Sequence, residues 1–182
     1  MRLETARLIL RPWEDRDRPD LARILGDAEV RRFYPSPLDR AGSDALIDRT
    51  TDILSTRGFS LLCAELKQTG RCVGTIGLLP LSDALRAALP VAAEVEIGWQ
   101  LDSAVWGQGL APEGAASCLD HAFRTFGLPR VVAFTYEGNR PSRRVMEKLG
   151  MRAAGAFLHP NLPEGHRLRP HVAYGAEAPL PG

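Results

Sequence analysis

The chain has little cysteine and almost no net charge. Its 182 residues hold three cysteines, and 23 Lys and Arg offset 22 Asp and Glu to a formal net charge of +1. Cys63, Cys72 and Cys118 each lie in an apolar stretch and are too few and too irregularly spaced for a disulfide framework or a zinc site. A chain this close to neutral also lacks the broad basic field that binds nucleic acid. We therefore expect a reducing, cytoplasmic setting, no metal and no nucleic-acid partner.

Long apolar runs, repeats and low-complexity tracts are also missing. No stretch approaches the roughly 20 apolar residues that a membrane-spanning helix needs. The N-terminal segment MRLETARLIL interleaves charged and apolar residues and has no secretory signal pattern. A chain of this length buries roughly 70% of its unfolded surface as one unit. We expect a single domain over residues 1–182 that makes no contact with a membrane.

Helical and strand patterns alternate along the chain. Helices are predicted at Arg18–Leu25 and Ser43–Thr56, the second with Ser43 as N-cap and Gly58 just past its end. Strands are predicted at Arg7–Arg11, Phe59–Glu65, Arg71–Leu78, Glu94–Leu101, Val131–Thr135, Arg152–Leu158 and His171–Tyr174. Phe59–Glu65 and Arg71–Leu78 flank a short turn, which is typical of an antiparallel hairpin. The alternation indicates an α/β fold with a mixed central sheet and helices on both faces.

The segment Leu81–Val91 is rich in Ala and Leu. It is too apolar for an ordinary solvated loop and too short for a stable isolated helix. We expect this segment to be a lid or an association surface, and an association surface would allow a homodimer.

A glycine-spaced turn, WGQGLAPEG at Trp106–Gly114, follows the Glu94–Leu101 strand and opens a helix. The apolar stripe of that helix consists of Ala115, Leu119, Ala122, Phe123 and Phe126. Unpaired N–H groups and the positive end of the helix dipole favour an anion such as a pyrophosphate in front of the turn. Gly107 and Gly109 supply backbone freedom, and Pro112 suits a first helical turn. Two glycines at such a connection also occur for purely steric reasons, so the turn alone does not define a ligand.

A second strand-turn-helix unit follows immediately. After the Val131–Thr135 strand come Asn139 and Ser142, and then a helix that ends in EKLGM. Ser142 has the chemistry of an N-cap.

These ordered segments resemble the GNAT superfamily of acetyl-CoA-dependent N-acetyltransferases, and in particular its Rim-type (ribosomal-protein-alanine acetyltransferase-like) branch. The likeness spans nearly the whole chain. It rests on ETARLILR at Glu4–Arg11, GTIG at Gly74–Gly77, EIG at Glu96–Gly98, WGQGLAPE, and the Asn-x-x-Ser helix start that closes on EKLGM. The wider superfamily usually has Gln or Arg in place of Trp106, whereas Trp is common in the Rim-type branch.

The resemblance implies a GNAT-like acyl-CoA N-acyltransferase fold, with a mixed, mostly antiparallel sheet of about seven strands. It places the pantetheine arm of acetyl-CoA where that sheet opens between its fourth and fifth strands. The pyrophosphate would lie on the backbone around Gln108, Gly109 and Ala111, and Leu101 would offer backbone hydrogen bonds to the pantetheine. The implied cofactor-binding set is Leu101, Trp106, Gly107, Gln108, Gly109, Ala111, Pro112, Asn139 and Ser142. In this set the Asn139 side chain contacts the cofactor near its pantetheine, and the alternative is that Asn139 only caps the helix that follows it.

The acceptor amine needs a base, because an amine with a pKa of about 10 is mostly protonated at neutral pH. Glu94 and Glu96 lie on one face of the predicted strand with Cα atoms about 6.5 Å apart, and like charges that close raise the pKa of one carboxylate. Polar-out alternation on a half-exposed strand explains the same pattern equally well. Glu96 matches the branch's strand better, so we choose Glu96 as base, acting directly or through water.

The leaving thiolate of CoA needs a proton. Many superfamily members use a Tyr in the helix before the Lys-Leu-Gly turn, but here that position is Met146, which has no proton to give. Ser142 is the best remaining candidate for the general acid, ahead of Tyr136 and Tyr174. Departure of the thiolate into solvent is the alternative.

The resemblance implies that the acceptor is an amine, which belongs to a small molecule, an amino acid or a protein N-terminus. The late loop contains His159, His166, Arg167, Arg169 and His171, which could form a cationic rim that attracts an anionic acceptor or could simply be solvated. The resemblance implies direct acetyl transfer in a ternary complex. A catalytically silent acyl-CoA-binding or sensing module is the competing hypothesis, and a dinucleotide-binding domain is disfavoured because its glycine fingerprint is missing after the first strand.

Overall fold

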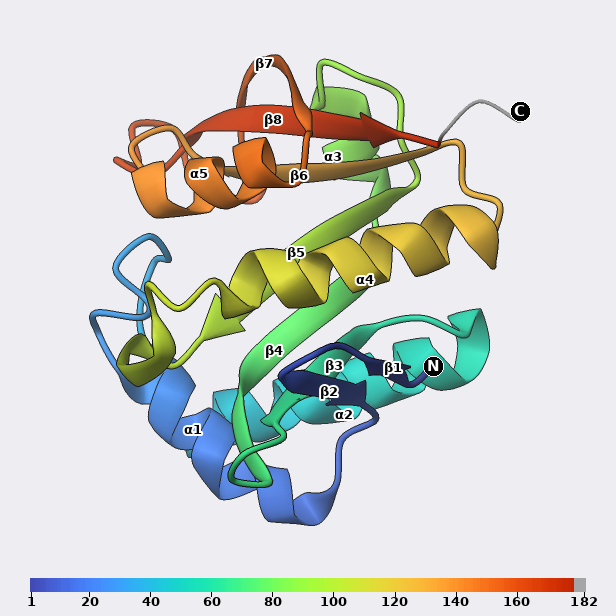
Figure 1. Cartoon of the computed structure of the whole chain (residues 1–182). Coiled ribbons are helices and arrows are strands. Elements are labelled where there is room, and N and C mark those ends of the chain that lie inside the picture. The colour runs from blue at the N-terminus through green and yellow to red at the C-terminus, as the bar shows by residue number, and fades with distance from the viewer. Residues whose placement is uncertain (179–182) are drawn as a thin grey trace. The chain divides into compact units, whose positions relative to one another are not determined.

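The computed structural model describes residues 1–178 and has the expected α/β class (Figure 1). Its eight strands are mostly antiparallel. The strand beyond the seven predicted is β1, Leu3–Glu4, whose two residues are too few to leave a pattern in the sequence. The chain forms two compact units, one built from Met1–Leu79 and Gly98–Cys118 and the other from Pro80–Ile97 and the residues from Leu119 onward. Strand β5, Val95–Leu101, and helix α4, Leu110–Arg124, each contribute to both units.

The first unit contains an antiparallel meander. Its strands run in the order β1-β2-β3-β4, with β2 at Leu8–Arg11, β3 at Leu61–Leu66 and β4 at Arg71–Pro80. The second half of β5 lies against β4, where the N–H of Asp102 donates to the carbonyl of Val73 at 2.9 Å. Gly74 permits this approach, since a Cβ there would lie 2.1 Å from the carbonyl oxygen of Gln100. Strands β3 and β4 pair antiparallel, from Leu61 with Gly77 to Leu66 with Arg71, which confirms the predicted hairpin.

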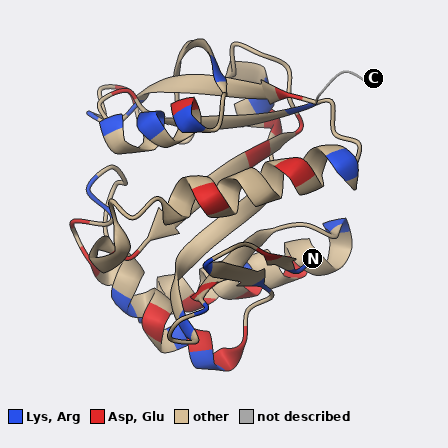
Figure 2. Cartoon of the chain, viewed as in Figure 1, with Lys and Arg blue, Asp and Glu red and all other residues tan. Residues whose placement is uncertain are grey.

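The N-terminal part of the first unit contains a single 3-10 turn, η1, at Asp15–Asp17, followed by α1 at Arg18–Gly26 and α2 at Arg40–Arg57. A buried cluster of Leu21, Ile24, Leu25 and Ile47 joins α1 to α2. Basic and acidic residues are interspersed along both helices (Figure 2). Some form ion pairs within one helix, such as Arg40 with Asp44 at 2.8 Å on α2.

The prediction that Ser43 caps α2 was wrong. The helix begins three residues earlier, because the Asp39 carboxylate accepts a hydrogen bond from the N–H of Gly42 at 2.7 Å. Ser43 lies inside the first turn and is fully buried. The predicted end is confirmed, since Gly58 adopts the left-handed conformation with φ of 77° and its N–H donates to Leu54.

A buried ion network lies between β2, η1 and β3. The Arg11 guanidinium donates to both carboxylate oxygens of Asp17 at 2.7 and 2.8 Å and to Glu65 at 2.8 Å. Arg11 and Asp17 are each only 3% exposed. These hydrogen bonds outweigh the unfavourable burial of the guanidinium, so the pKa of Arg11 is raised above its ordinary value.

The second unit is a smaller sheet. The first half of β5 pairs in parallel with β6, Arg130–Tyr136, through Glu96 and Val132. Strand β8, Pro170–Glu177, lies antiparallel between β6 and the edge strand β7, Arg152–Leu158. The helices of this unit are α3, Asp83–Ala88, and α5, Arg140–Lys148, together with the C-terminal part of α4.

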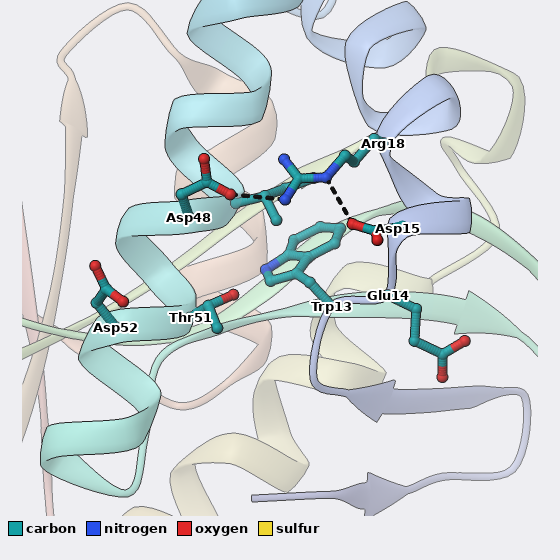
Figure 3. A pocket seen from close by; sticks show the side chains of 8 residues that line it. Trp13, Glu14, Asp15, Arg18, Asp48, Thr51 and Asp52 are labelled. Carbon is teal, nitrogen blue, oxygen red and sulfur yellow. Dashed lines mark hydrogen bonds and ion pairs between the residues drawn. The ribbon is translucent and has the colours of Figure 1, made fainter.

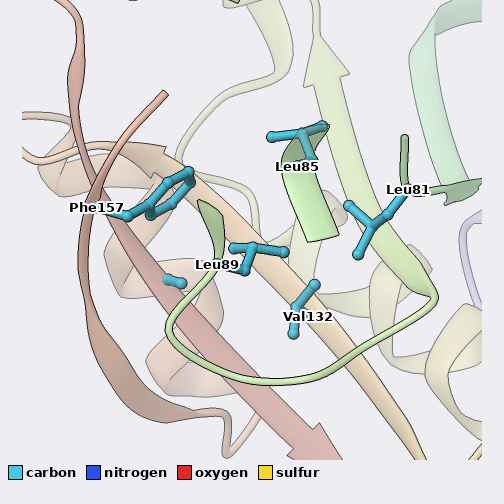
Figure 4. Close-up of a cluster of buried hydrophobic side chains, with 6 residues drawn as sticks. Leu81, Leu85, Leu89, Val132 and Phe157 are labelled. Carbon is cyan, nitrogen blue, oxygen red and sulfur yellow. The ribbon is translucent and has the colours of Figure 1, made fainter. Parts of the chain in front are cut away.

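The segment Leu81–Val91 packs into the core of the second unit, which corrects its assignment as a lid or association surface. Ser82 caps the short helix α3 by accepting from the N–H of Leu85. Leu81, Leu85 and Leu89 are then buried against Val132, Phe157 and Ala173 from the sheet (Figure 4). The segment is too short for an isolated helix, but tertiary packing stabilises it.

Within residues 1–178, no helix combines the length and the apolar character that a bilayer-spanning segment requires.

Candidate functional site

The turn between β5 and α4 has the geometry of an anion site. After Leu101 the chain forms a 3-10 turn, η2, at Ser103–Val105, capped by Asp102, and α4 begins at Leu110. Gly107 and Gly109 both have positive φ, 75° and 79°, a conformation that L side chains rarely adopt. No acceptor among residues 1–178 takes a hydrogen bond from the N–H of Gly109, Leu110 or Ala111. These groups remain available to a ligand at the positive end of the helix dipole.

Trp106 closes this turn onto the end of β5. Its indole N–H donates to the carbonyl of Leu101 at 2.8 Å, and the side chain remains 39% exposed. The guanidinium of Arg32, from the loop that follows α1, lies over the indole at 4.9 Å from its centroid. The Leu101 carbonyl thus already accepts one hydrogen bond inside the protein.

The sequence analysis missed an ion cluster in which residues between β1 and β2 contact the turn and the start of α4. Glu113, in the first turn of α4, accepts from the hydroxyl of Thr5 at 2.6 Å, from the N–H of Arg7 at 2.8 Å and from Nε of Arg7 at 2.7 Å. Burial raises the pKa of Glu113, but the hydrogen bonds from Thr5 and Arg7 lower it by a larger amount. The pKa of this carboxyl therefore lies below its ordinary value. Both partners lie in motif segments, ETAR at Glu4–Arg7 and PEG at Pro112–Gly114. No local pattern in the sequence indicates that these two segments are in contact.

Arg7 also fixes the direction of a peptide group in the turn. Its Nη1 donates to the carbonyl of Gln108 at 2.8 Å. Because a trans peptide is planar, the Gln108 carbonyl and the Gly109 N–H point in opposite directions. Holding the carbonyl toward Arg7 therefore aims the Gly109 N–H away from Arg7.

Asn139, rather than Ser142, is the N-cap of α5. Its side-chain oxygen accepts from the N–H of Ser142 at 3.2 Å, and its side-chain nitrogen donates to Thr135 at 2.8 Å. The N-cap assignment of Ser142 was therefore wrong, because Asn139 occupies the N-cap position and Ser142 lies inside the helix. Ser142 occupies the third helical position, where its half-buried hydroxyl has no hydrogen bond with the described residues.

The two glutamates proposed for proton removal lie in different settings. Glu96 is on β5 and half-buried. Glu94 precedes the strand, is exposed, and forms an ion pair with Arg86 at 2.6 Å. Because β5 begins at Val95, Glu94 lies outside the strand that was predicted to include both glutamates.

Met146, at the usual position of the general acid, and the two alternative candidates Tyr136 and Tyr174 all belong to the second unit. Met146 is 1% exposed and belongs to the core. The Tyr174 hydroxyl accepts from Arg143 at 3.3 Å and donates to Glu147 at 3.5 Å. Tyr136 is a half-buried residue at the end of β6, beside Gly138.

Two histidines of the late loop, His159 and His171, pack against aromatic rings and do not contribute to a cationic rim. The rings of His159 and His171 lie 4.8 Å apart and contact Phe134 and Phe157. Burial lowers the pKa of His171 to about 4 and lowers that of His159 as well, so both are neutral at pH 7. His159 and His171 therefore act as aromatic packing residues.

A pocket of about 350 Å³ lies elsewhere in the first unit, between η1 and α2. Trp13 forms one wall, and Arg18 bridges Asp15 at 3.0 Å and Asp48 at 2.7 Å (Figure 3). None of the predicted site residues lines it. Residues 1–178 also hold no group of three or more His, Cys, Asp or Glu arranged for a metal ion.

The structure gathers one part of the predicted site in each unit. Leu101, Trp106, Gly107, Gln108, Gly109, Ala111 and Pro112 are together in the first unit. Glu96, Asn139 and Ser142 belong to the second unit.

Comparison with known proteins agrees with this geometry. The family model described as "Acetyltransferase (GNAT) domain" matches residues 7–152. The Bacillus subtilis (strain 168) protein named "Uncharacterized protein YkkB" is 32% identical over 151 residues, which are 82% of this chain and 84% of that protein. From the same strain, "Uncharacterized N-acetyltransferase YoaA" is 29% identical over 164 residues, 85% of each chain.

Solved structures share the fold. The acetyltransferase (GNAT family) from Bacillus anthracis has a TM-score of 0.81 at 23% identity, covering 98% of this chain and 99% of that chain. Mycobacterium smegmatis RimJ in complex with CoA-disulfide has a TM-score of 0.75 at 22% identity, covering 96% of this chain and 87% of that chain. The chain belongs to the GNAT acetyltransferase family and is an N-acetyltransferase.

Proposed function

We propose that this chain transfers the acetyl group of acetyl-CoA directly to a primary amine, as a single catalytic domain over residues 1–182 that works in the cytoplasm. The observation that carries the proposal is the set of N–H groups at the start of α4 that have no acceptor among residues 1–178. They suit the diphosphate of CoA, which the GNAT family uses. Membership of the Rim-type branch is part of the proposal, supported by WGQGLAPE and by the fold of RimJ.

Each predicted cofactor residue has a role in this proposal. The turn Trp106–Pro112 binds the diphosphate through its backbone, and Leu101 and Asn139 contact the pantetheine. Asn139 can do so while capping α5, because an amide oxygen has two lone pairs. Acetyl-CoA supplies an activated thioester when bound.

Glu96 and Ser142 handle the protons. Glu96 takes a proton from the acceptor amine, so that the neutral nitrogen forms the new C–N bond as the C–S bond breaks. Ser142 donates its proton to the departing thiolate, since its hydroxyl forms no hydrogen bond with the described residues. The partner is therefore an amine-bearing acceptor, and no nucleic acid or membrane takes part.

Thiol release from acetyl-CoA with a panel of amines tests the proposal. Glu96→Gln should abolish release while leaving acetyl-CoA binding, measured by calorimetry, unchanged. Glu94→Gln is the matched control and should keep full activity, because Glu94 is exposed and paired with Arg86. Unchanged turnover in Glu96→Gln would remove Glu96 from the mechanism.

A catalytically silent acyl-CoA-binding module is the second candidate, favoured by the burial of Met146 at the usual acid position. This candidate predicts acetyl-CoA binding without thiol release for every amine in the panel.

A further inference from the structure

Arg31 is a half-buried cation that meets only neutral groups in the described part of the chain. It lies in the loop between α1 and α2, where its Nε donates to the carbonyl of Ser36 at 3.1 Å and its Nη1 to the side-chain oxygen of Gln100 at 3.4 Å. Its guanidinium carbon lies 3.9 Å from the ring centroid of Tyr34. Among residues 1–178, no carboxylate forms an ion pair with Arg31, whereas its neighbour Arg32 pairs with Glu29.

This arrangement is unfavourable unless something compensates the charge. Removing a guanidinium from water without a counterion costs free energy, and burial accordingly lowers the pKa of Arg31. A guanidinium has five N–H donors, and two of them meet only neutral oxygens here. Nη2 donates to no acceptor among the described residues. A bound anion would supply both the charge and the missing acceptors.

The position of Arg31 connects it with the proposed reaction. Gln100, which it contacts, directly precedes Leu101 at the end of β5. Leu101 is the residue of this strand that is proposed to contact the pantetheine of acetyl-CoA.

The loop that carries Arg31 also lies beside the turn that precedes α4 (Figure 1). The Ser103 hydroxyl contacts the Asp27 carboxylate at 3.3 Å, and Arg32 covers Trp106. An anion bound by Arg31 is therefore close to the end of β5 at which the thioester is proposed to bind.

We propose that Arg31 binds a carboxylate on the acceptor, so that the acceptors are amines of the amino-acid type rather than simple amines. This inference rests on the proposed function. It assigns the acceptor's specificity to the loop between α1 and α2 and not to the late loop, where His159 and His171 are neutral.

The test compares amino acids with their carboxamides, which differ mainly by the negative charge. Wild-type kcat/KM should favour the carboxylate by about 10- to 100-fold over the carboxamide, the range of a hydrogen bond to a charged group. Arg31→Gln should remove most of this preference and leave the carboxamide rate and the Kd for acetyl-CoA unchanged, whereas Arg31→Lys should keep part of it. Arg40→Gln is the matched control, since Arg40 pairs with Asp44 on the exposed side of α2.

A binding measurement keeps the inference testable without turnover. In the presence of CoA, an N-acetyl amino acid should bind the wild type more tightly than its carboxamide, and Arg31→Gln should abolish the difference. Equal affinities in the wild type, or a preference that survives in folded Arg31→Gln, would overturn the inference. So would weaker acetyl-CoA binding with an intact carboxylate preference, because Arg31 would then serve a CoA phosphate. Failure of the proposed function is distinguishable, since the wild type would then not bind acetyl-CoA.

Discussion

Removing the Arg7 side chain tests whether the proposed diphosphate site is prearranged. In Arg7→Ala the Gln108 carbonyl loses its guanidinium donor, and the peptide that carries the Gly109 N–H is free to rotate. Gly109, with its positive φ and no Cβ, offers little resistance to that rotation. Glu113 keeps its bonds to Thr5 and to the N–H of Arg7, so its charge stays near the turn.

The size of the effect follows from the hydrogen bond that the Arg7 guanidinium donates to the Gln108 carbonyl. A hydrogen bond to a charged group contributes about 1.5–3 kcal/mol, and the 47% exposure of the Arg7 side chain places it at or below the low end of that range. A loss of about 1–1.5 kcal/mol corresponds to roughly five- to tenfold weaker binding of acetyl-CoA.

Isothermal titration with acetyl-CoA and with acetyl-pantetheine, which lacks the diphosphate, is the appropriate assay. Arg7→Ala should weaken acetyl-CoA and leave acetyl-pantetheine unchanged. Arg124→Ala, which removes an exposed ion pair with Asp120 near the other end of α4, is the control and should change neither affinity. An Arg7→Ala protein that binds acetyl-CoA like the wild type, or that loses affinity for both ligands equally, would refute the reasoning.

Two further predictions concern stability. Asp17→Ala should lower the free energy of unfolding by about 3–5 kcal/mol, because it leaves the Arg11 guanidinium buried with one partner fewer. Burial raises the pKa of Asp17, but hydrogen bonds from Arg11 and from a backbone N–H lower it below its ordinary value. Urea titrations should therefore show that the difference from wild type shrinks as the pH falls below about 4, and a difference independent of pH would contradict this. His171 is neutral in the folded protein down to pH about 4 but protonates near 6.5 when unfolded, so stability should fall as the pH is lowered through this window. His171→Gln should reduce that slope and Phe134→Leu should not; equal slopes in all three proteins would exclude His171 as the cause.

The sequence predicted most of the fold because local signals and the hydrophobic pattern agree. The strand Arg152–Leu158 is found as predicted, and Gly58 ends α2 in the left-handed conformation that its position suggested. The cap assignments failed where two polar residues compete within a few positions. Asp39 precedes Ser43, and Asn139 precedes Ser142, and in each pair the earlier residue caps the helix.

What the sequence could not supply were contacts between distant segments. Arg7 and Glu113 are far apart in the chain, and neither their ion pair nor the hold of Arg7 on Gln108 leaves a local pattern. The apolar residues of Leu81–Val91 indicated burial, but only the sheet of the second unit shows what buries them. His159 and His171 lose their charge through tertiary burial, which composition does not reveal.

The most direct test of the central claim is a crystal structure of the protein with CoA. We expect the diphosphate oxygens within about 3 Å of the backbone nitrogens at the start of α4, those of Gly109, Leu110 and Ala111. A diphosphate bound elsewhere, with these N–H groups facing solvent or satisfied by the protein itself, would contradict the account.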